Sequence, residues 1–482
     1  MTTRPSGAAA LADRLARPVP ALSLAVFRIA LGAMLVWDCW RFIKYDRVWR
    51  YWVAPEFHFT YPGFHWVQPL PEPWIHVAWL AMGVCALLVM LGLFYRIAIV
   101  ALTVLFSYFF LLDKAEYLNH FYLVILFLIL MCFLPAHRAM SLDARLFPRA
   151  RGTHVPYGAV FMLRAQMEIM LIYAGLVKLT PDWLAGEPLG MWLRSQADAH
   201  WFGFLLHYDW VILAGTWGTV ILHVVGAPLL LWERTRLATF CVYCLFHAAN
   251  ALFFNIGIFP WLTILATTIF FAPDWPRQAA RWLHTRFEEL PAHVPPPAPA
   301  ARALPAAALV AMAGWLAVQI VLPIRAGAFP TEVRWSGDGH RFSWRMRIYD
   351  RETDGVFVVT SGAQSWLVDP RDYLTDRQAW KMMPRSDMVH QFAGHLERVW
   401  QEAGHGDVEV RAEIVKSLNG RPMQQFIDPE VDLTAVPLGY LRADPWVLPL
   451  DRRVWGVADN RAETPSAPAE GDGDTDGSGR TS

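Results

Sequence analysis

The chain has 482 residues, of which 55% are hydrophobic and 17% are charged, and its formal net charge is zero. Soluble globular domains carry roughly 25% charged residues, so this composition favours a membrane protein over a soluble one. The 24 tryptophans agree, because indole rings concentrate where a bilayer meets water. The balanced charge gives no indication of a nucleic-acid partner, and the five cysteines, all in apolar runs, predict neither a disulfide framework nor a metal site.

Hydrophobic runs long enough to cross about 30 Å of hydrocarbon occur at nine places in the chain. They lie near residues 22–42, 73–95, 97–112, 117–135, 157–179, 210–232, 236–255, 256–273 and 303–324. The seventh and eighth runs are nearly continuous, and Asn255, Gly257 and Pro260 supply the break between them. The first run is too long for a cleavable signal peptide, so we expect it to remain as an anchor.

The loops between these runs predict the orientation of the chain. With the N-terminus inside, the inner segments hold roughly twice as many lysines and arginines as the outer ones, which places the N-terminus in the cytoplasm. Nine crossings then place everything after about residue 325 outside the cell membrane.

The region after the ninth run has the pattern of a separate domain. Residues 341–351, 355–361 and 407–415 alternate in the manner of strands, and an amphipathic helix with Ser386 as its N-cap follows "MMPR". From about residue 462 the chain lacks apolar residues, which is typical of disorder. We therefore predict an all-α polytopic membrane domain followed by a mixed β/α outer domain. The predicted parts are a membrane domain (1–290), a linker with the last span (291–325), an extracytoplasmic β-rich domain (326–461) and a disordered tail (462–482).

Five polar residues lie inside or at the ends of three predicted spans. Asn119 and His120 open the fourth span, Lys178 closes the fifth, and His247 and Asn250 lie near the end of the seventh. The fourth span is predicted to run inward, whereas the fifth and seventh run outward, so all five residues are predicted at a similar depth near the outer face. Ionisable groups in a membrane are costly and are functional candidates. The structural alternatives are a lysine that extends to the headgroups and histidines that only pack.

Other polar residues lie deeper in the spans and have structural interpretations. Arg164 and Glu168 are four residues apart on one helix face, which predicts an internal ion pair. His223 on the sixth span is predicted to be a core histidine.

Several segments carry a resemblance to a known family. "LDKAEYLNHFYLVILFLILMCFLPAHRAMSLD", "YAGLVKLTPDWLAG" and "FHAANALFFNIGIFP" resemble the membrane part of the vitamin K-dependent γ-glutamyl carboxylases. "LPIRAGAFPTEVRWSGDGHRFSWRMRIYDR" and "DPRDYLTDRQAWKMM" resemble the lumenal domain of the same family, in the same order. The resemblance covers roughly residues 20–450.

The resemblance implies a mechanism that begins with Lys178, which occupies the place of the family's membrane-embedded base. A free lysine has a pKa near 10.4, and removal from water lowers that value, so a neutral amine could take a proton from a reduced naphthoquinone. The family couples reduced vitamin K, of the menaquinol or phylloquinol type, to O2 and CO2. The quinol leaves as an epoxide while a protein glutamate gains a carboxyl group, and no metal takes part.

The resemblance also implies roles for further residues. His120 matches a functional histidine, with Asn119 beside it to orient the quinol, and His247 and Asn250 are expected around the glutamate. Trp344, Met346, Tyr349 and Arg351 are expected between the quinone pocket and the outer domain, with Arg351 holding the substrate carboxylate by a two-point bond.

The chain departs from the animal enzymes in ways that favour a bacterial member of the family. Animal enzymes carry two adjacent lysines where this chain has Val177-Lys178, and no Asn-x-Ser/Thr sequon is present. These features favour a bacterial plasma membrane. Three functions stay open: a carboxylase, a quinol epoxidase or oxidase without carboxylation, and a non-catalytic membrane protein that binds a lipid or partner.

Overall fold

The computed structural model describes residues 7–254, 256–287, 298–439 and 443–451. Within these residues, seven helical stretches are long and apolar enough to cross a bilayer. They are α2 (Leu22–Lys44), α4 (Trp74–Leu91), α5 (Tyr95–Leu112), α8 (Tyr157–Leu176), α11 with η5 and α12 (Asp209–Leu231), α13 (Glu233–Phe253), and α16 with η7 (Ala306–Ala328). The shorter apolar helices α6 (Asn119–Phe133) and α14 with η6 (Phe259–Phe270) occupy the other two predicted runs. The predicted fold class is confirmed. The predicted ion pair within α8 is wrong, because Arg164 donates to Ile269 O (2.8 Å) and Phe271 O (2.7 Å) instead of to Glu168.

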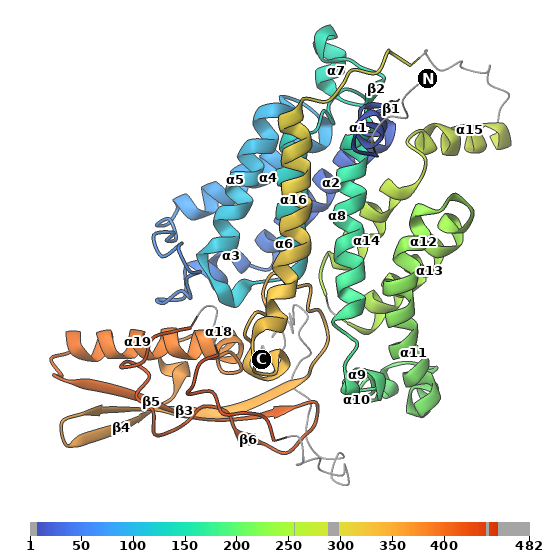
Figure 1. Cartoon of the computed structure of the whole chain (residues 1–482). Helices are drawn as coiled ribbons and strands as arrows, with labels where there is room; N and C mark the ends of the chain where they lie inside the picture. Colours follow the sequence, from blue (N-terminus) through green and yellow to red (C-terminus); the bar gives the residue numbers. More distant parts are fainter. Residues whose placement is uncertain (1–6, 255, 288–297, 440–442, 452–482) are drawn as a thin grey trace, which may run out of the picture.

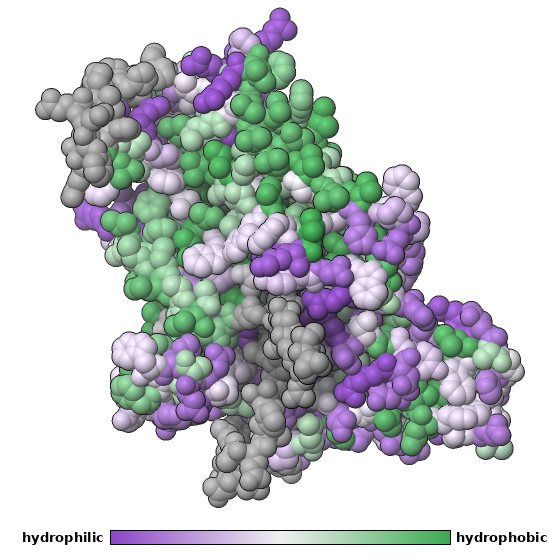
Figure 2. All heavy atoms as spheres, turned by 180° about the vertical axis from the view of Figure 1, so that it is seen from behind, coloured by the Kyte–Doolittle hydropathy of each residue, from purple (hydrophilic) through white to green (hydrophobic). Residues whose placement is uncertain are grey.

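Shorter elements cap the two ends of the helical part. At one end lie α1 (Gly7–Ala16), α7 (Leu142–Leu146), α15 (Trp275–Phe287) and a small antiparallel sheet of β1 (Pro18–Pro20) and β2 (His154–Pro156). The outer domain lies at the opposite end, near α9 (Pro181–Leu184) and α10 (Leu189–Arg194) (Figure 1). On the face that Figure 2 shows, hydrophobic residues predominate on the helical part, and hydrophilic residues are frequent on the outer domain. The compartment that each end faces stays a prediction.

The outer domain is built on a four-stranded antiparallel sheet in the order β4-β3-β5-β6. The strands are β3 (Arg351–Ser361), β4 (Gln364–Val368), β5 (Val408–Leu418) and β6 (Gln424–Gln425). The long strands pair along their whole length, from Arg351↔Leu418 to Ser361↔Val408. Helix α19 (Ser386–Glu402) packs on this sheet through Phe392, which is fully buried against Phe357. Helices α17 (Val333–Ser336) and α18 (Asp376–Met382) complete the domain.

Two predictions for the outer domain were wrong in detail. Residues 341–350 do not form a strand, because Phe342, Trp344 and Arg347 have left-handed backbone angles (φ of 62°, 56° and 50°) that an extended strand excludes. Ser386 is the first residue of α19 rather than its N-cap, and its hydroxyl donates to the Asp338 carboxylate (3.3 Å). The predicted tail, residues 462–482, and the first part of the predicted linker lie outside the described residues.

Ion pairs join the loop after α5 to the outer domain. Arg377 on α18 makes a two-point bond to the Glu116 carboxylate (2.7 and 2.9 Å), and Lys114 pairs with Asp387 on α19 (2.6 Å). Both Lys114 and Glu116 belong to η1 (Lys114–Glu116), so one turn of chain connects the helical part to two helices of the outer domain.

Candidate functional site

A cavity of about 360 Å³ lies where the helical part meets the outer domain. This volume lies within the range of small-molecule sites. Its apolar wall includes Met170, Leu171, Ala174, Trp183, Leu189, Trp192, Leu193, Leu206, Val211, Phe246, Phe253, Phe254, Ile256 and Phe259. Its polar groups come from α6, α11, η5, α13 and Lys178 on one side and from residues 340–347, Lys381 and Arg385 on the other.

Lys178 lies two residues beyond the end of α8 and is 6% exposed. Its Nζ donates to Ala174 O (2.9 Å) one turn earlier and to Met346 O (3.0 Å) in the outer domain, and the Trp183 ring lies 5.2 Å away. Among the described residues, the lysine has no carboxylate as an ion-pair partner. Burial lowers the pKa of Lys178 to about 7, so a large fraction of the amine is neutral near neutral pH.

His223 reaches the same cavity through a local irregularity in its helix. Residues Leu222–Gly226 (η5) form a π-helical turn directly before Pro228, whose ring and missing N–H disrupt the regular helical bonding. Gly175 on α8 allows this turn to approach, since a Cβ at Gly175 would lie 2.7 Å from the Cβ of His223. His223 Nδ1 bonds to Thr219 O (2.8 Å), so the imidazole is a packed core group, as predicted, that also lines the cavity.

Asn119 and His120 open helix α6 at the cavity wall. Asn119 Oδ1 accepts from the Tyr117 hydroxyl (3.1 Å), and its Nδ2 donates to Arg345 O (3.3 Å) in the outer domain. His120 is 8% exposed, with its ring 6.0 Å from that of Phe259. The beginning of this helix is therefore held by the outer domain at the point where its polar side chains reach the cavity.

His247 and Asn250 line the cavity from α13. The His247 ring is buried, lies 5.8 Å from the Phe259 ring, and has no hydrogen bond to another described protein group at either nitrogen. Asn250 Nδ2 donates to Phe246 O (2.9 Å), which leaves its side-chain oxygen available. Thus Phe259 lies between His120 and His247, and the residues predicted from three spans are brought together on one cavity.

The segment 340–347 forms the opposite wall, and its backbone bonds to the helical part instead of to a neighbouring strand. Its carbonyl groups at 341, 345 and 346 accept bonds from Arg325, Asn119 and Lys178 respectively. The amide of Phe342 donates to the Tyr117 hydroxyl (2.7 Å). Left-handed non-glycine residues cost of order 1–3 kcal/mol each and concentrate at functional sites. Contacts made by the helical part thus hold this segment in its conformation.

The outer end of the cavity is rich in cations. Its lining there includes the cations Lys114, Arg341, Arg345, Arg347, Lys381 and Arg385, together with His340, whose pKa burial lowers well below its ordinary value. Asp387 pairs with Lys114 (2.6 Å) and with Arg341 (2.8 Å). Burial would raise the pKa of Asp387, but these two cations outweigh burial and hold it well below its ordinary value. The Asp387 carboxylate therefore holds Lys114 and Arg341 together at this end of the cavity.

Three of the predicted site residues do not line the cavity. Trp344 packs behind it, with its ring 5.0 Å from that of Tyr122. The Tyr349 hydroxyl bonds to the His340 ring, and the Arg351 guanidinium lies 3.6 Å above the Tyr349 ring while its Nε donates to Arg334 O (3.0 Å). Met346 is the one member of that predicted group that reaches the cavity.

Sequence reasoning missed the cationic end. The alternation in "RFSWRMRIYDR" favours a strand, although the same segment places three arginines within seven residues. That density of arginine was the available signal. Among the described residues, no group of three or more His, Cys, Asp or Glu side chains is placed to hold a metal ion.

Comparison with known protein families divides the chain in two. Residues 16–275 match the family model described as the HTTM domain, and residues 305–453 match the model described as the vitamin K-dependent gamma-carboxylase lumenal domain. No solved structure matches the chain. The cavity is lined by residues from both matched regions.

Proposed function

Because the chain belongs to the vitamin K-dependent gamma-carboxylase family, we propose that it couples oxygen-dependent epoxidation of a reduced naphthoquinone to carboxylation of protein glutamate. The observation that carries the proposal is Lys178, a buried amine on the wall of a cavity shared by the two matched regions. An anchoring lysine places its amine among headgroups and water, whereas this amine bonds to two carbonyl groups inside the protein.

Lys178 is assigned the role of the base. Its Nζ accepts the proton of a quinol hydroxyl, the O–H bond breaks, and the amine becomes an ammonium that the carbonyls of Ala174 and Met346 can bind. The absence of an ion-pair partner among the described residues favours the neutral starting form. When bound, the reduced naphthoquinone supplies with O2 the strong base that removes a γ-proton of glutamate, after which CO2 adds to that carbon.

The cavity fits a quinol in shape and chemistry. Met170, Leu171 and Phe259 supply apolar contact for a ring system. The His247 nitrogens and the Asn250 side-chain oxygen can bond to its polar groups, since His247 has no other described partner. Asn119 and His120 are assigned to orientation of the quinol oxygen at the level of the base.

We assign the acceptor carboxylate to the cationic end rather than to Arg351. Arg345, Arg347 and Lys381 line the cavity on the side of the outer domain. A guanidinium or ammonium stabilises a carboxylate by a charged hydrogen bond. The contacts of Arg351 support a different role, in which it holds the ring of Tyr349.

The test is incubation of the purified protein with reduced vitamin K, O2, labelled bicarbonate and a glutamate-rich peptide. Epoxide and fixed label are measured separately, and the proposal expects both. Epoxide without fixed label would support the quinol epoxidase instead, and the absence of both products would overturn the enzymatic assignment.

A further inference from the structure

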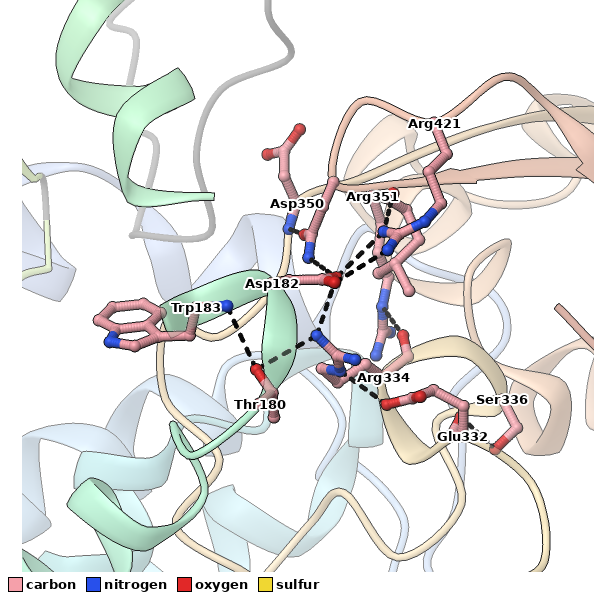
Figure 3. Close-up of polar contacts among 11 residues, drawn as sticks. Thr180, Asp182, Trp183, Glu332, Arg334, Ser336, Asp350, Arg351 and Arg421 are labelled. Atoms are coloured by element: carbon pink, nitrogen blue, oxygen red, sulfur yellow. Dashed lines mark hydrogen bonds and ion pairs between the residues drawn. The ribbon is translucent and has the colours of Figure 1, made fainter. Parts of the chain in front are cut away.

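Asp182 is a buried carboxylate that joins the turn after Lys178 to the outer domain. It lies on α9, four residues after Lys178, and its side chain is 5% exposed. The Asp182 carboxylate accepts two hydrogen bonds from the Arg421 guanidinium (2.9 and 3.0 Å). It also accepts one from Arg334 Nη1 (2.9 Å) and one from Asn419 Nδ2 (2.7 Å) (Figure 3). All three donors belong to the outer domain.

The charges around Asp182 balance within the cluster. Arg334 also pairs with Glu332 (2.6 Å), so two guanidinium groups face two carboxylates. Burial would raise the pKa of Asp182, but its bonds to Arg421 and Arg334 outweigh burial and lower the value. Each guanidinium thus has a carboxylate partner within the cluster, and we attribute the influence of Asp182 on the amine to its position.

The hydrogen bonds of Asp182 and Lys178, together with the backbone between them, form a closed circuit that returns to the amine. The Asn419 side chain that donates to Asp182 also accepts from the Asp350 amide (2.8 Å), and four residues before Asp350 lies Met346, whose carbonyl accepts from Lys178 Nζ (3.0 Å). From the amine the path therefore runs through Met346, Asp350, Asn419 and Asp182 back to Lys178.

The next residue along α9 supports the amine directly. The ring of Trp183 lies 5.2 Å from Lys178 Nζ, and its indole N–H donates to Thr216 O on α11 (3.0 Å). The hydroxyl of Thr180 caps the same turn. A shift of α9 would therefore move the ring that faces the amine as well as the loop that carries it.

We propose that Asp182 is a positioning residue, which locks the Lys178 turn onto the outer domain and so fixes the amine at the cavity wall. This inference rests on the proposed role of Lys178 as the base. The alternative is a purely structural role, in which Asp182 only stabilises the domain interface, as Glu116 does with its two-point bond to Arg377. Glu116 has no contact with Lys178 or its turn among the described bonds, so it provides a matched control.

The test compares Asp182→Asn with Glu116→Gln in the full-length protein. Two quantities are measured: the pH profile of epoxide formation, and the rate at which Lys178 is reductively methylated, followed by mass spectrometry. We expect Asp182→Asn to lower epoxide formation at pH 7 by about 10- to 100-fold, with partial recovery at higher pH, because a displaced amine gains water and protonates more easily. Methylation of Lys178 should shift toward higher pH in the same variant.

The control and a second variant define the outcomes that overturn the inference. Glu116→Gln should reduce thermal stability without moving either pH dependence. Asn419 has a left-handed backbone (φ of 54°), which glycine also adopts without strain. Asn419→Gly should therefore keep the backbone conformation, remove the side chain that bonds to both Asp182 and Asp350, and reproduce the shift in pH dependence. A folded Asp182→Asn protein with wild-type pH dependence, or an equal shift in Glu116→Gln, would refute the positioning role. Methylation needs no turnover, so it decides this inference even if the wild type forms no epoxide.

Discussion

Replacement of Lys178 by arginine separates a base from a membrane anchor. At pH 7 an amine with a pKa of about 7 is about half neutral, whereas an ordinary guanidinium is neutral in fewer than roughly 1 molecule in 10⁵. Burial can lower an arginine pKa by about two units, so we expect Lys178→Arg to reduce epoxide formation by at least about 100-fold. The rate of the wild type should rise with pH through about 7, instead of near the ordinary lysine value.

The matched control is Lys44, an exposed lysine at the end of α2. Its Nζ lies 5.2 Å from the Trp40 ring and 5.1 Å from the Tyr45 ring, as expected for an amine at a membrane surface. Lys44→Arg should retain activity within about twofold. Epoxide is measured chromatographically with purified variants in proteoliposomes, and a small added amine should partly restore Lys178→Ala. Near-normal epoxide formation by Lys178→Arg would refute the assignment of a base.

The buried amine should also reduce stability in a pH-dependent way. Between about pH 7 and 10.4 the unfolded chain binds the Lys178 proton while the folded chain releases it, so wild-type stability increases as pH rises through this window. Lys178→Met removes the buried amine. Its free energy of unfolding should therefore exceed that of the wild type by on the order of a few kcal/mol at pH 7, and the difference should shrink toward pH 10. Thermal unfolding in detergent measures it, and a constant difference across this window would contradict the lowered pKa.

Three further predictions concern the interface, the histidines and the topology. Asp387→Asn should lower the free energy of unfolding by about 3 kcal/mol, because it leaves two buried cations without their carboxylate; an unchanged thermal midpoint would contradict this. His120→Ala should lose at least about 100-fold in turnover with little change in thermal midpoint, whereas His223→Ala should mainly lower the midpoint; equal losses of activity in two folded variants would remove the distinction. A cysteine at Glu413 should react with an impermeant maleimide on intact cells and one at Arg145 should not, and the reverse result would invert the predicted orientation.

The part of the candidate site that lies in the helical domain could be predicted, because the direction in which each span crosses the membrane determines the depth of the residues at its two ends. Lys178 ends one span, His120 begins another, and His247 lies near the end of a third, so a count of crossings was enough to place them together. The hydrophobic runs that allow this count are a local signal that a single sequence carries.

The outer wall could not be predicted, because its conformation depends on partners distant in the chain. The carbonyl of Arg345 is bonded by a side chain 226 residues away, and that of Met346 by one 168 residues away. Local alternation favoured a strand there, and tertiary contacts overrode it. Asp182 likewise resembled an ordinary acidic residue in the first turn of a helix, since the residues that bond to it come from two separate segments of the outer domain.

The bond between Lys178 and Met346 also orders the events of biosynthesis. A ribosome makes Lys178 168 residues before its outer-domain partner, and the four apolar helical stretches that follow Lys178 must insert before Met346 reaches the same side of the membrane. During that interval the amine lacks the wall that keeps water from it and therefore retains the pKa of an ordinary lysine. Under the proposed function, a chain that stalls before its outer domain docks would carry the helices that line the cavity but lack the wall that completes it, and it would therefore not oxidise quinol.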